Sequence, residues 1–163
     1  MKPILAALLA VTLVGCAAYQ PIPPGYVGPV ATVSDSGFAE DGTKAQLFVL
    51  AEVDGNGIPN SFGASAGASY GKGFALTTRV VDRQVPAKPM KVKLRASHTT
   101  GAPIQAMFSQ AAGTFFSVDG VVDFTPKADG KYVVKGELKK EGSSVWIEDA
   151  NTNQPVTEKI LKK

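Results

Sequence analysis

The sequence is poor in residues that bind metals or form disulfides, with one cysteine and one histidine among 163 residues. Because Cys16 has no partner within the chain, an intramolecular disulfide is excluded. Cys16 and His98 provide too few sulfur and nitrogen ligands for a zinc site, so we expect no metal, and no motif indicates a cofactor. The net charge of +3 comes without a basic stripe, which argues against a nucleic-acid partner.

The apolar run at the beginning of the chain is too short to cross a membrane, and no later run is longer. It covers residues 4–14 behind Lys2 and is interrupted by Thr12. A transmembrane helix needs about 20 apolar residues. A positive start, a run of about 7–15 apolar residues and a small residue are typical of a secretory signal. We therefore predict a signal peptide over residues 1–15.

The residues at the predicted cleavage site are Leu13-Val14-Gly15-Cys16. This motif resembles the lipobox of bacterial lipoproteins, in which a small residue directly precedes the cysteine and a leucine stands three residues before it. The resemblance is confined to residues 1–16. It implies a diacylglycerol on the Cys16 thiol, removal of the signal, and acylation of the new amino terminus by a chain such as palmitate. Two or more acyl chains anchor a protein stably without a transmembrane segment.

The residue after the cysteine indicates the membrane. In Gram-negative lipoproteins, an Asp at that position tends to retain the protein in the inner membrane, and this chain has Ala17 there. The resemblance therefore implies a lipid-anchored protein of the outer membrane that faces the periplasm. Lys2 is the only charged residue before Cys16, so cleavage changes the net charge from +3 to +2.

Proline and glycine are concentrated in residues 16–29. Because proline fixes φ and donates no backbone hydrogen bond, we interpret this stretch as a semi-rigid, lipidated tether. The alternative is that Tyr26 and Val27 pack onto the domain as its first edge. No second linker interrupts residues 30–163, which are enough to form one domain with its own core.

Alternating apolar and charged residues predict strands in that domain. In residues 91–97 the cations point to one face while Val92 and Leu94 point to the other, which is the period of a half-buried strand. Residues 44–53 are apolar on both faces, as expected for a central strand. The other predicted strands are 30–34, 74–81, 104–109, 115–118, 121–125, 131–138, 144–148 and 156–160.

Asp-Gly pairs separate several of these strands, at 41–42, 54–55, 119–120 and 129–130. Asp-Gly supplies the positive φ that tight hairpin turns need, and the clearest predicted hairpin is 115–125 around Asp119-Gly120. No segment combines a helical apolar period with caps. Many short strands favour an all-β fold, an antiparallel β-sandwich, with a small β-barrel as the alternative.

Residues 61–73 differ from the rest because they contain almost no large side chains. We expect a mobile loop or a glycine-rich edge strand. Long loops in compact domains are often functional, so this segment is the first candidate binding region, with a flexible connector as the alternative. The candidate binding residues are Ser65, Ser69, Tyr70 and Lys72.

Two overlapping G-x-S-x-G patterns place Ser65 and Ser69 at the serine of a hydrolase motif. That motif requires a helix after the serine and a distant histidine, whereas His98 follows too closely to leave room for the intervening sheet. We therefore predict no enzyme and no catalytic residue. We expect His98 on the surface or at a strand end, and Trp146 in the core.

The predicted localisation and fold favour an envelope lipoprotein with a non-catalytic binding or structural module in the periplasm. In general pattern the domain resembles uncharacterised proteobacterial lipoproteins with β-sandwich domains. The expected partners are the membrane, through lipid on Cys16, and an envelope protein or cell-wall ligand. One alternative is a periplasmic inhibitor of a host or rival enzyme that inserts residues 65–72 into a cleft. A minor alternative is a serine hydrolase built on Ser65 or Ser69.

Overall fold

Ten strands and two helices occur in the described part of the chain, residues 19–162 of a computed structural model. The strands are β1 (Val30–Ser34), β2 (Ser36–Ala39), β3 (Lys44–Val53), β4 (Asn56–Gly57), β5 (Asp82–Pro86), β6 (Met90–Thr100), β7 (Ser117–Phe124), β8 (Lys131–Glu137), β9 (Ser143–Asp149) and β10 (Ile160–Lys162). The helices are α1 (Ser61–Ser69) and α2 (Pro103–Ala111).

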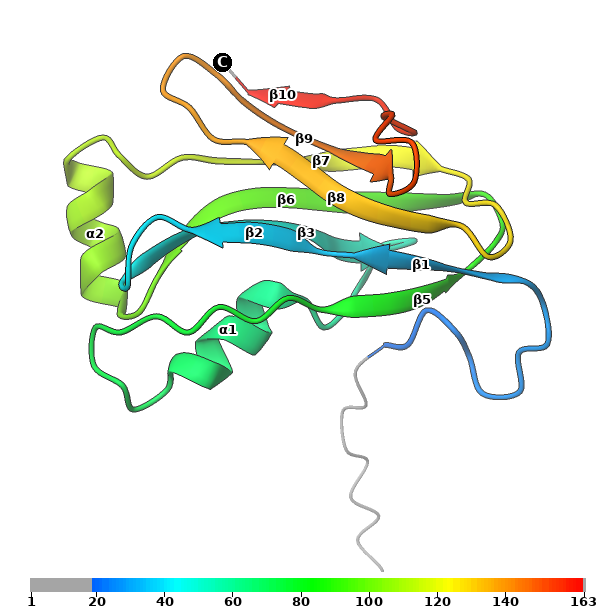
Figure 1. Cartoon of the computed structure of the whole chain (residues 1–163), viewed down its shortest axis with the longest axis horizontal. Coiled ribbons are helices and arrows are strands. Elements are labelled where there is room, and N and C mark those ends of the chain that lie inside the picture. Colours follow the sequence, from blue (N-terminus) through cyan, green and yellow to red (C-terminus); the bar gives the residue numbers. More distant parts are fainter. Residues whose placement is uncertain (1–18, 163) are drawn as a thin grey trace, which may run out of the picture.

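The strands form two sheets that pack face to face (Figure 1). The first sheet has the order β10-β9-β8-β1-β5, and the second has the order β2-β3-β6-β7 with β4 paired to β3. Neighbouring strands are antiparallel except β1 and β8, which are parallel. The predicted β-sandwich is therefore confirmed, and the strands do not close into a barrel.

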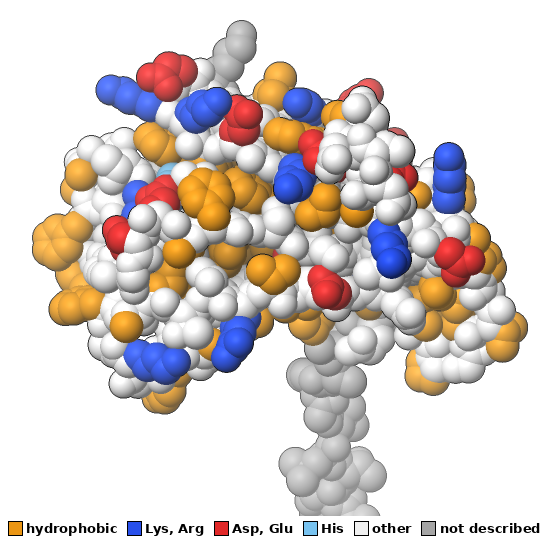
Figure 2. Space-filling model, viewed as in Figure 1, with side chains coloured by type: hydrophobic (Ala, Val, Ile, Leu, Met, Phe, Trp, Pro, Cys, Tyr) orange, Lys and Arg blue, Asp and Glu red, His pale blue; other side chains and the backbone are white. Residues whose placement is uncertain are grey.

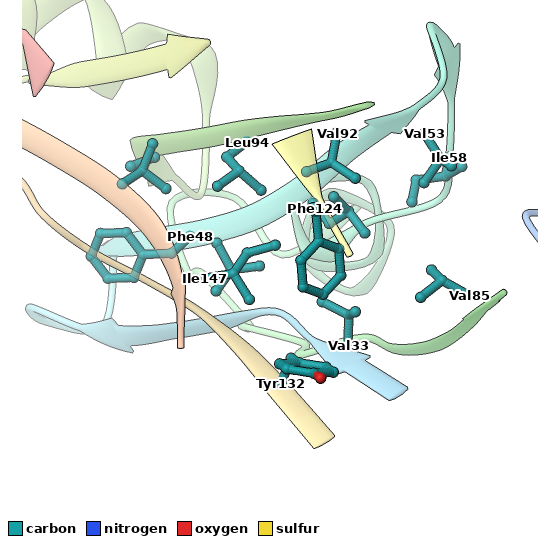
Figure 3. Close-up of a cluster of buried hydrophobic side chains, with 14 of the residues drawn as sticks. Val33, Phe48, Val53, Ile58, Val85, Val92, Leu94, Phe124, Tyr132 and Ile147 are labelled. Carbon is teal, nitrogen blue, oxygen red and sulfur yellow. The ribbon is translucent and has the colours of Figure 1, made fainter. Parts of the chain in front are cut away.

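The core between the sheets follows from the alternation in the sequence. On β6, Val92 and Leu94 are fully buried while Lys91 and Arg95 are exposed. Figure 3 shows Val92 and Leu94 together with Phe48 of β3 and side chains from the other sheet. Each fully buried aliphatic or aromatic side chain contributes about 1.5–3 kcal/mol to folding, so this layer is the main source of stability.

β3 is buried on both faces, as its apolar composition predicts. Phe48 and Leu50 belong to the core between the sheets. Leu47 and Val49 point to the opposite face and are also fully buried. α1 contacts β3 and covers that outer face of the second sheet. The helix therefore completes a second, smaller buried layer.

Asp35 is the single residue between β1 and β2, where the chain crosses from the first sheet to the second. Its side chain is fully buried. Oδ1 accepts hydrogen bonds from the Leu50 amide at 3.0 Å and from Arg83 Nη1 at 2.7 Å. Oδ2 accepts from the amide and the hydroxyl of Ser61, both at 2.8 Å. One carboxylate thus joins the crossing to β3, α1 and β5.

Several predicted strands are wrong. Residues 104–109 belong to α2, where Pro103 is the first residue and the Gln105 side chain accepts a hydrogen bond from the Ala102 amide at 2.9 Å. Both the proline and glutamine at the start of α2 and the spacing of its apolar residues are typical of a helix. Residues 74–81 form no strand, and residues 156–160 reach a strand only at Ile160.

The predicted hairpin at 115–125 is also wrong, because β7 runs straight through Asp119-Gly120. Gly120 serves close packing there rather than a turn, since an added Cβ would lie 3.0 Å from Cγ2 of Ile160 in β10, which would have to move slightly. Asp54-Gly55 does form a tight turn, with φ of 48° and 80°, and Asp129 has a φ of 57°. Asp54-Gly55 joins the antiparallel pair β3 and β4 and Asp41-Gly42 lies between the antiparallel pair β2 and β3, as the hairpin prediction requires, whereas Asp129-Gly130 forms a turn between strands of different sheets.

Residues 19–29 contain no helix or strand. Pro21 is buried, whereas Val27 is 99% exposed and does not pack onto the domain as its first edge. The segment joins the domain where the Ala87 amide donates to the Pro29 carbonyl at 2.8 Å. The predicted signal peptide and Cys16 lie outside the described residues.

We expect Asp35→Ala to lower the free energy of unfolding by about 3–5 kcal/mol, because it leaves the buried Arg83 guanidinium without its partner. Urea denaturation of the two proteins measures the difference. Asp123→Ala is the matched control, since the Asp123 side chain is 82% exposed although it also contacts a cation, Lys91. An Asp35→Ala variant as stable as the Asp123→Ala control would contradict the role given to Asp35.

Candidate functional site

The segment predicted as a loop or edge strand begins with a helix, α1. Asn60 caps it, because its side chain accepts a hydrogen bond from the Phe62 amide at 3.0 Å. The buried face of α1 consists of Ser61, Ser65 and Ser69, at intervals of four residues. A search for apolar residues at helical spacing misses this helix because its inward face is made of serine.

The three serines bind the backbone of residues 77–81, which run extended beside the helix. The amide of Val81 donates to Ser61 Oγ at 3.0 Å, and that of Arg79 donates to Ser65 Oγ at 2.9 Å. Thr77 donates to Ser69 Oγ at 2.8 Å. The serines are four residues apart on the helix, which is about 6 Å along its axis. The amides that they bind are two residues apart in an extended chain, which is about 6.6 Å, so the two spacings match. α1 therefore occupies the place of a neighbouring strand.

This arrangement brings two of the four candidate binding residues, Ser69 and Tyr70, to one cleft and leaves Ser65 and Lys72 outside it. Ser65 and Ser69 are buried, and each hydroxyl accepts a backbone amide. Tyr70 is 91% exposed, and Lys72 Nζ donates to Thr77 Oγ1 at 3.0 Å on the surface. The expected loop is therefore a helix over most of its length, with serines that bind neighbouring backbone, while Tyr70 and Lys72 face outward.

A cleft of about 570 Å³ lies between α1, the second half of β6 and the start of α2. Small residues and aromatic rings make up most of its walls, and the remaining lining residues are hydroxyl-bearing or basic. The lining residues are Phe62, Ala66, Ser69, Tyr70, Gly71, Gly73, Arg95, Ser97, His98, Thr99, Thr100, Gly101, Ala102, Pro103, Ala106 and Phe115. Its volume lies within the range of small-molecule sites.

Two lining residues that sequence reasoning missed are Arg95 and Phe62. The Arg95 guanidinium lies over the Phe62 ring, 5.2 Å from its centroid. Such a cation–π contact orients the guanidinium without neutralising its charge. The alternation in β6 placed Arg95 on the outer face, but nothing in the sequence indicated that α1 would bring an aromatic ring to it.

His98 lies near the end of β6, as one of the two expected positions has it, but it is buried rather than on the surface. Its Nδ1 accepts a hydrogen bond from the Phe116 amide at 2.9 Å, and its Nε2 lies 2.8 Å from Glu40 Oε1. This network assigns the proton to Nε2, which donates to Glu40. The rings of Phe115 and Phe116 lie 5.7 and 5.6 Å from the imidazole. Both ring nitrogens are thus engaged in holding the fold.

Glu40 has three side-chain partners. Oε1 accepts from Gln46 Nε2 at 2.6 Å and from His98, and Oε2 lies 3.2 Å from Lys44 Nζ. Partial burial acts to raise the pKa of Glu40. The hydrogen bonds from Gln46 and Lys44 and the contact with His98 outweigh burial, so the pKa lies below its ordinary value.

Trp146 is buried, as predicted, but on the outer face of the first sheet. Its Nε1 donates to Glu148 Oε1 at 2.8 Å, and Lys159 Nζ lies 3.9 Å from the ring centroid. The neighbouring carboxylate of Asp149 instead accepts from the Asn151 amide at 2.8 Å. The two adjacent carboxylates therefore serve different local contacts.

α2 separates the cleft from an exposed apolar surface. Ala106 lines the cleft, whereas Met107 and Phe108 are 64% and 69% exposed. Phe74, Ile104 and Phe108 line a shallow depression beside them. Figure 2 shows apolar side chains at the end of the molecule that α2 occupies in Figure 1. No residue of α2 is buried, so this helix forms a surface feature beside the cleft.

Comparison of the chain with known protein families, curated proteins and solved structures finds no match. Within residues 19–162, the His, Cys, Asp and Glu side chains form no group of three that could hold a metal ion. In the same region no helix is long and apolar enough to span a bilayer. The residues that line the cleft are therefore the basis for its assignment.

We expect Ser65→Ala to lower the free energy of unfolding by about 1–2 kcal/mol, because the Arg79 amide loses its acceptor. The control is Gly63→Ala on the exposed face of α1, where an added Cβ meets nothing within 4 Å. It should raise stability by up to about 1 kcal/mol through helix propensity. If thermal unfolding shows that Ser65→Ala is stabilised like the control, the serine contacts do not hold α1 in place.

The lowered pKa of Glu40 predicts a pH-dependent contribution to stability. Since the folded-state pKa lies below the ordinary value of 4.5, the contribution is present above that value and is lost as the pH falls through the folded pKa. Glu40→Gln should therefore be less stable than the wild type at pH 7, with the difference shrinking below pH 4.5. Urea denaturation across this range, beside the exposed Glu141→Gln control, measures it. A constant difference would contradict this assignment.

Proposed function

We propose that this protein is an envelope lipoprotein, anchored by lipid on Cys16, whose β-sandwich is a non-catalytic binding module. The Leu13-Val14-Gly15-Cys16 motif supports the anchor. Residues 19–29, which contain no helix or strand, fit a connection between a lipidated cysteine and a folded domain. Ala17 supports attachment to the outer membrane, facing the periplasm.

The cleft between α1, β6 and α2 is the observation that carries the binding role. It combines a volume of about 570 Å³ with aromatic walls and a single arginine. Small-molecule sites are concave and mostly apolar, with a few polar groups that orient the ligand, and this cleft has that composition. A rigid sandwich supports the cleft, because β6 is paired on both sides.

The engagement of the nucleophile and base candidates supports a non-catalytic role. Catalysis by a serine requires its hydroxyl to lie within hydrogen-bond reach of a base. Ser65 and Ser69 instead bind the 77–81 backbone, while His98 binds Glu40 and Phe116. The hydrolase alternative therefore loses its support. The inhibitor alternative has weaker support, because Ser65 and Ser69 of its inserting segment are buried and only its end, at Tyr70 and Lys72, is exposed.

Cys16→Ser should abolish membrane attachment without changing the fold, because it removes the thiol that would carry the lipid. The measurement is fractionation of expressing cells into membrane and soluble portions, with mass spectrometry of the mature amino terminus. We expect a triacylated Cys16 in the wild type and release of most of the protein in the variant.

Ser109→Ala, at a partly exposed position of α2 distant in sequence from Cys16, is the control for the fractionation. An unmodified amino terminus in the wild type, or equal membrane association of Cys16→Ser and wild type, would overturn the anchor. Neither outcome would affect the assignment of the cleft, which rests on different residues.

A further inference from the structure

Arg95 is the only residue with a permanent charge that lines the cleft. Among residues 19–162, no carboxylate forms an ion pair with it. Its cross-strand neighbour on β7 is Asp119, whose Oδ2 lies 3.6 Å from Lys93 Nζ. The Arg95 side chain therefore lines the cleft with a positive charge that no ion pair compensates within these residues.

Phe62 holds this guanidinium from one side. The cation–π contact places the centre of the guanidinium 5.2 Å from the ring centroid, and no side chain or carbonyl of residues 19–162 accepts a hydrogen bond from the Arg95 N–H groups. Those N–H donors have the fork geometry that matches a carboxylate. Arg95 is therefore suited to bind a ligand group with two anionic oxygens, such as a carboxylate.

The other residues that line the cleft favour a ligand whose anionic group is attached to a flat apolar ring. The rings of Phe62 and Phe115 and the small side chains of Ala66 and Ala106 line the cleft, and the exposed ring of Tyr70 lies at its margin. Aromatic walls with small residues between them accept a planar ring system by stacking. Acidic side chains are absent from the lining of the cleft, so a bound anion meets no repulsion there.

Most hydroxyls of the cleft are already used within the fold. Ser69 Oγ accepts the Thr77 amide, Ser97 Oγ donates to the His98 carbonyl, and Thr100 Oγ1 donates to the Ala102 carbonyl. These groups offer little recognition of a sugar or another polyhydroxylated ligand. The charge of Arg95 and the apolar walls therefore determine the ligand.

We propose that the cleft binds a small ring-containing carboxylate, with its carboxylate on Arg95 and its ring between the aromatic walls. This inference rests on the proposed binding function and specifies the ligand class of that cleft. The ligand is an organic monoanion of modest size, because the cleft holds one cation within about 570 Å³.

The test uses the full chain carrying Cys16→Ser, so that lipid does not compete for the apolar probe. The probes are 2-naphthoate, the neutral 2-naphthylmethanol and the cationic 2-naphthylmethylamine. Titrations followed by ¹⁵N–¹H NMR give affinity and location together. We expect 2-naphthoate to shift the amides of Gly71, Gly73 and Gly101 and to bind at least tenfold more tightly than the alcohol.

Arg95→Met is the decisive variant, since it removes the charge and keeps an unbranched side chain over Phe62. It should weaken 2-naphthoate binding at least tenfold and leave the affinity for 2-naphthylmethanol unchanged. Lys93→Met is the matched control, because it removes a cation two residues away on the same face of β6 and outside the cleft. It should bind 2-naphthoate like the wild type.

Three results would overturn the ligand class: equal affinity for the carboxylate and the alcohol, preference for the amine, or an Arg95→Met variant that binds 2-naphthoate as the wild type does. In each case, amide shifts confined to the cleft would leave the proposed binding function standing. If none of the three probes shifts the amides of the cleft, both the ligand class and the binding role of the cleft fail.

Discussion

The buried carboxylate of Asp35 is the constraint on which the arrangement of this sandwich depends. The chain changes sheets at this residue, so an error in its position would displace β1 and β2 together. Hydrogen bonds from Leu50, Ser61 and Arg83 satisfy the carboxylate, which compensates for removing its charge from water. Because Ser61 begins α1, the same group also fixes where the helix starts. Asp35 thus helps to fix the position of α1, which forms one side of the cleft, although Asp35 itself does not line the cleft.

Elements with a clear period of two were predictable from the sequence. β1 and β3 have the predicted bounds, and β6, β8 and β9 differ only at their ends. The failures have physical causes. In α1 the inward face is made of serine, so an apolar period is absent. In α2 the apolar period is helical but faces solvent, and in β7 Gly120 serves packing against Ile160 rather than a turn.

The candidate site was less predictable than the fold because its parts come from separate elements. The four candidate residues lie together in sequence, but only Ser69 and Tyr70 line the cleft, while Ser65 is buried and Lys72 lies on the surface outside it. The cleft forms only when α1 and α2 lie across β6. Its chemistry then depends on Arg95, which looks in the sequence like one of several cations on an exposed strand face.

The serine row on α1 has a consequence for how the molecule behaves among its own copies. Amides along an uncovered edge of a sheet are a template on which strands of other molecules add, leading to aggregation. Beside α1, the amides of Thr77, Arg79 and Val81 already have serine acceptors. An incoming strand would find these donors occupied and a helix in its path. A row of small hydroxyls thus protects this stretch of backbone from pairing with other copies of the chain.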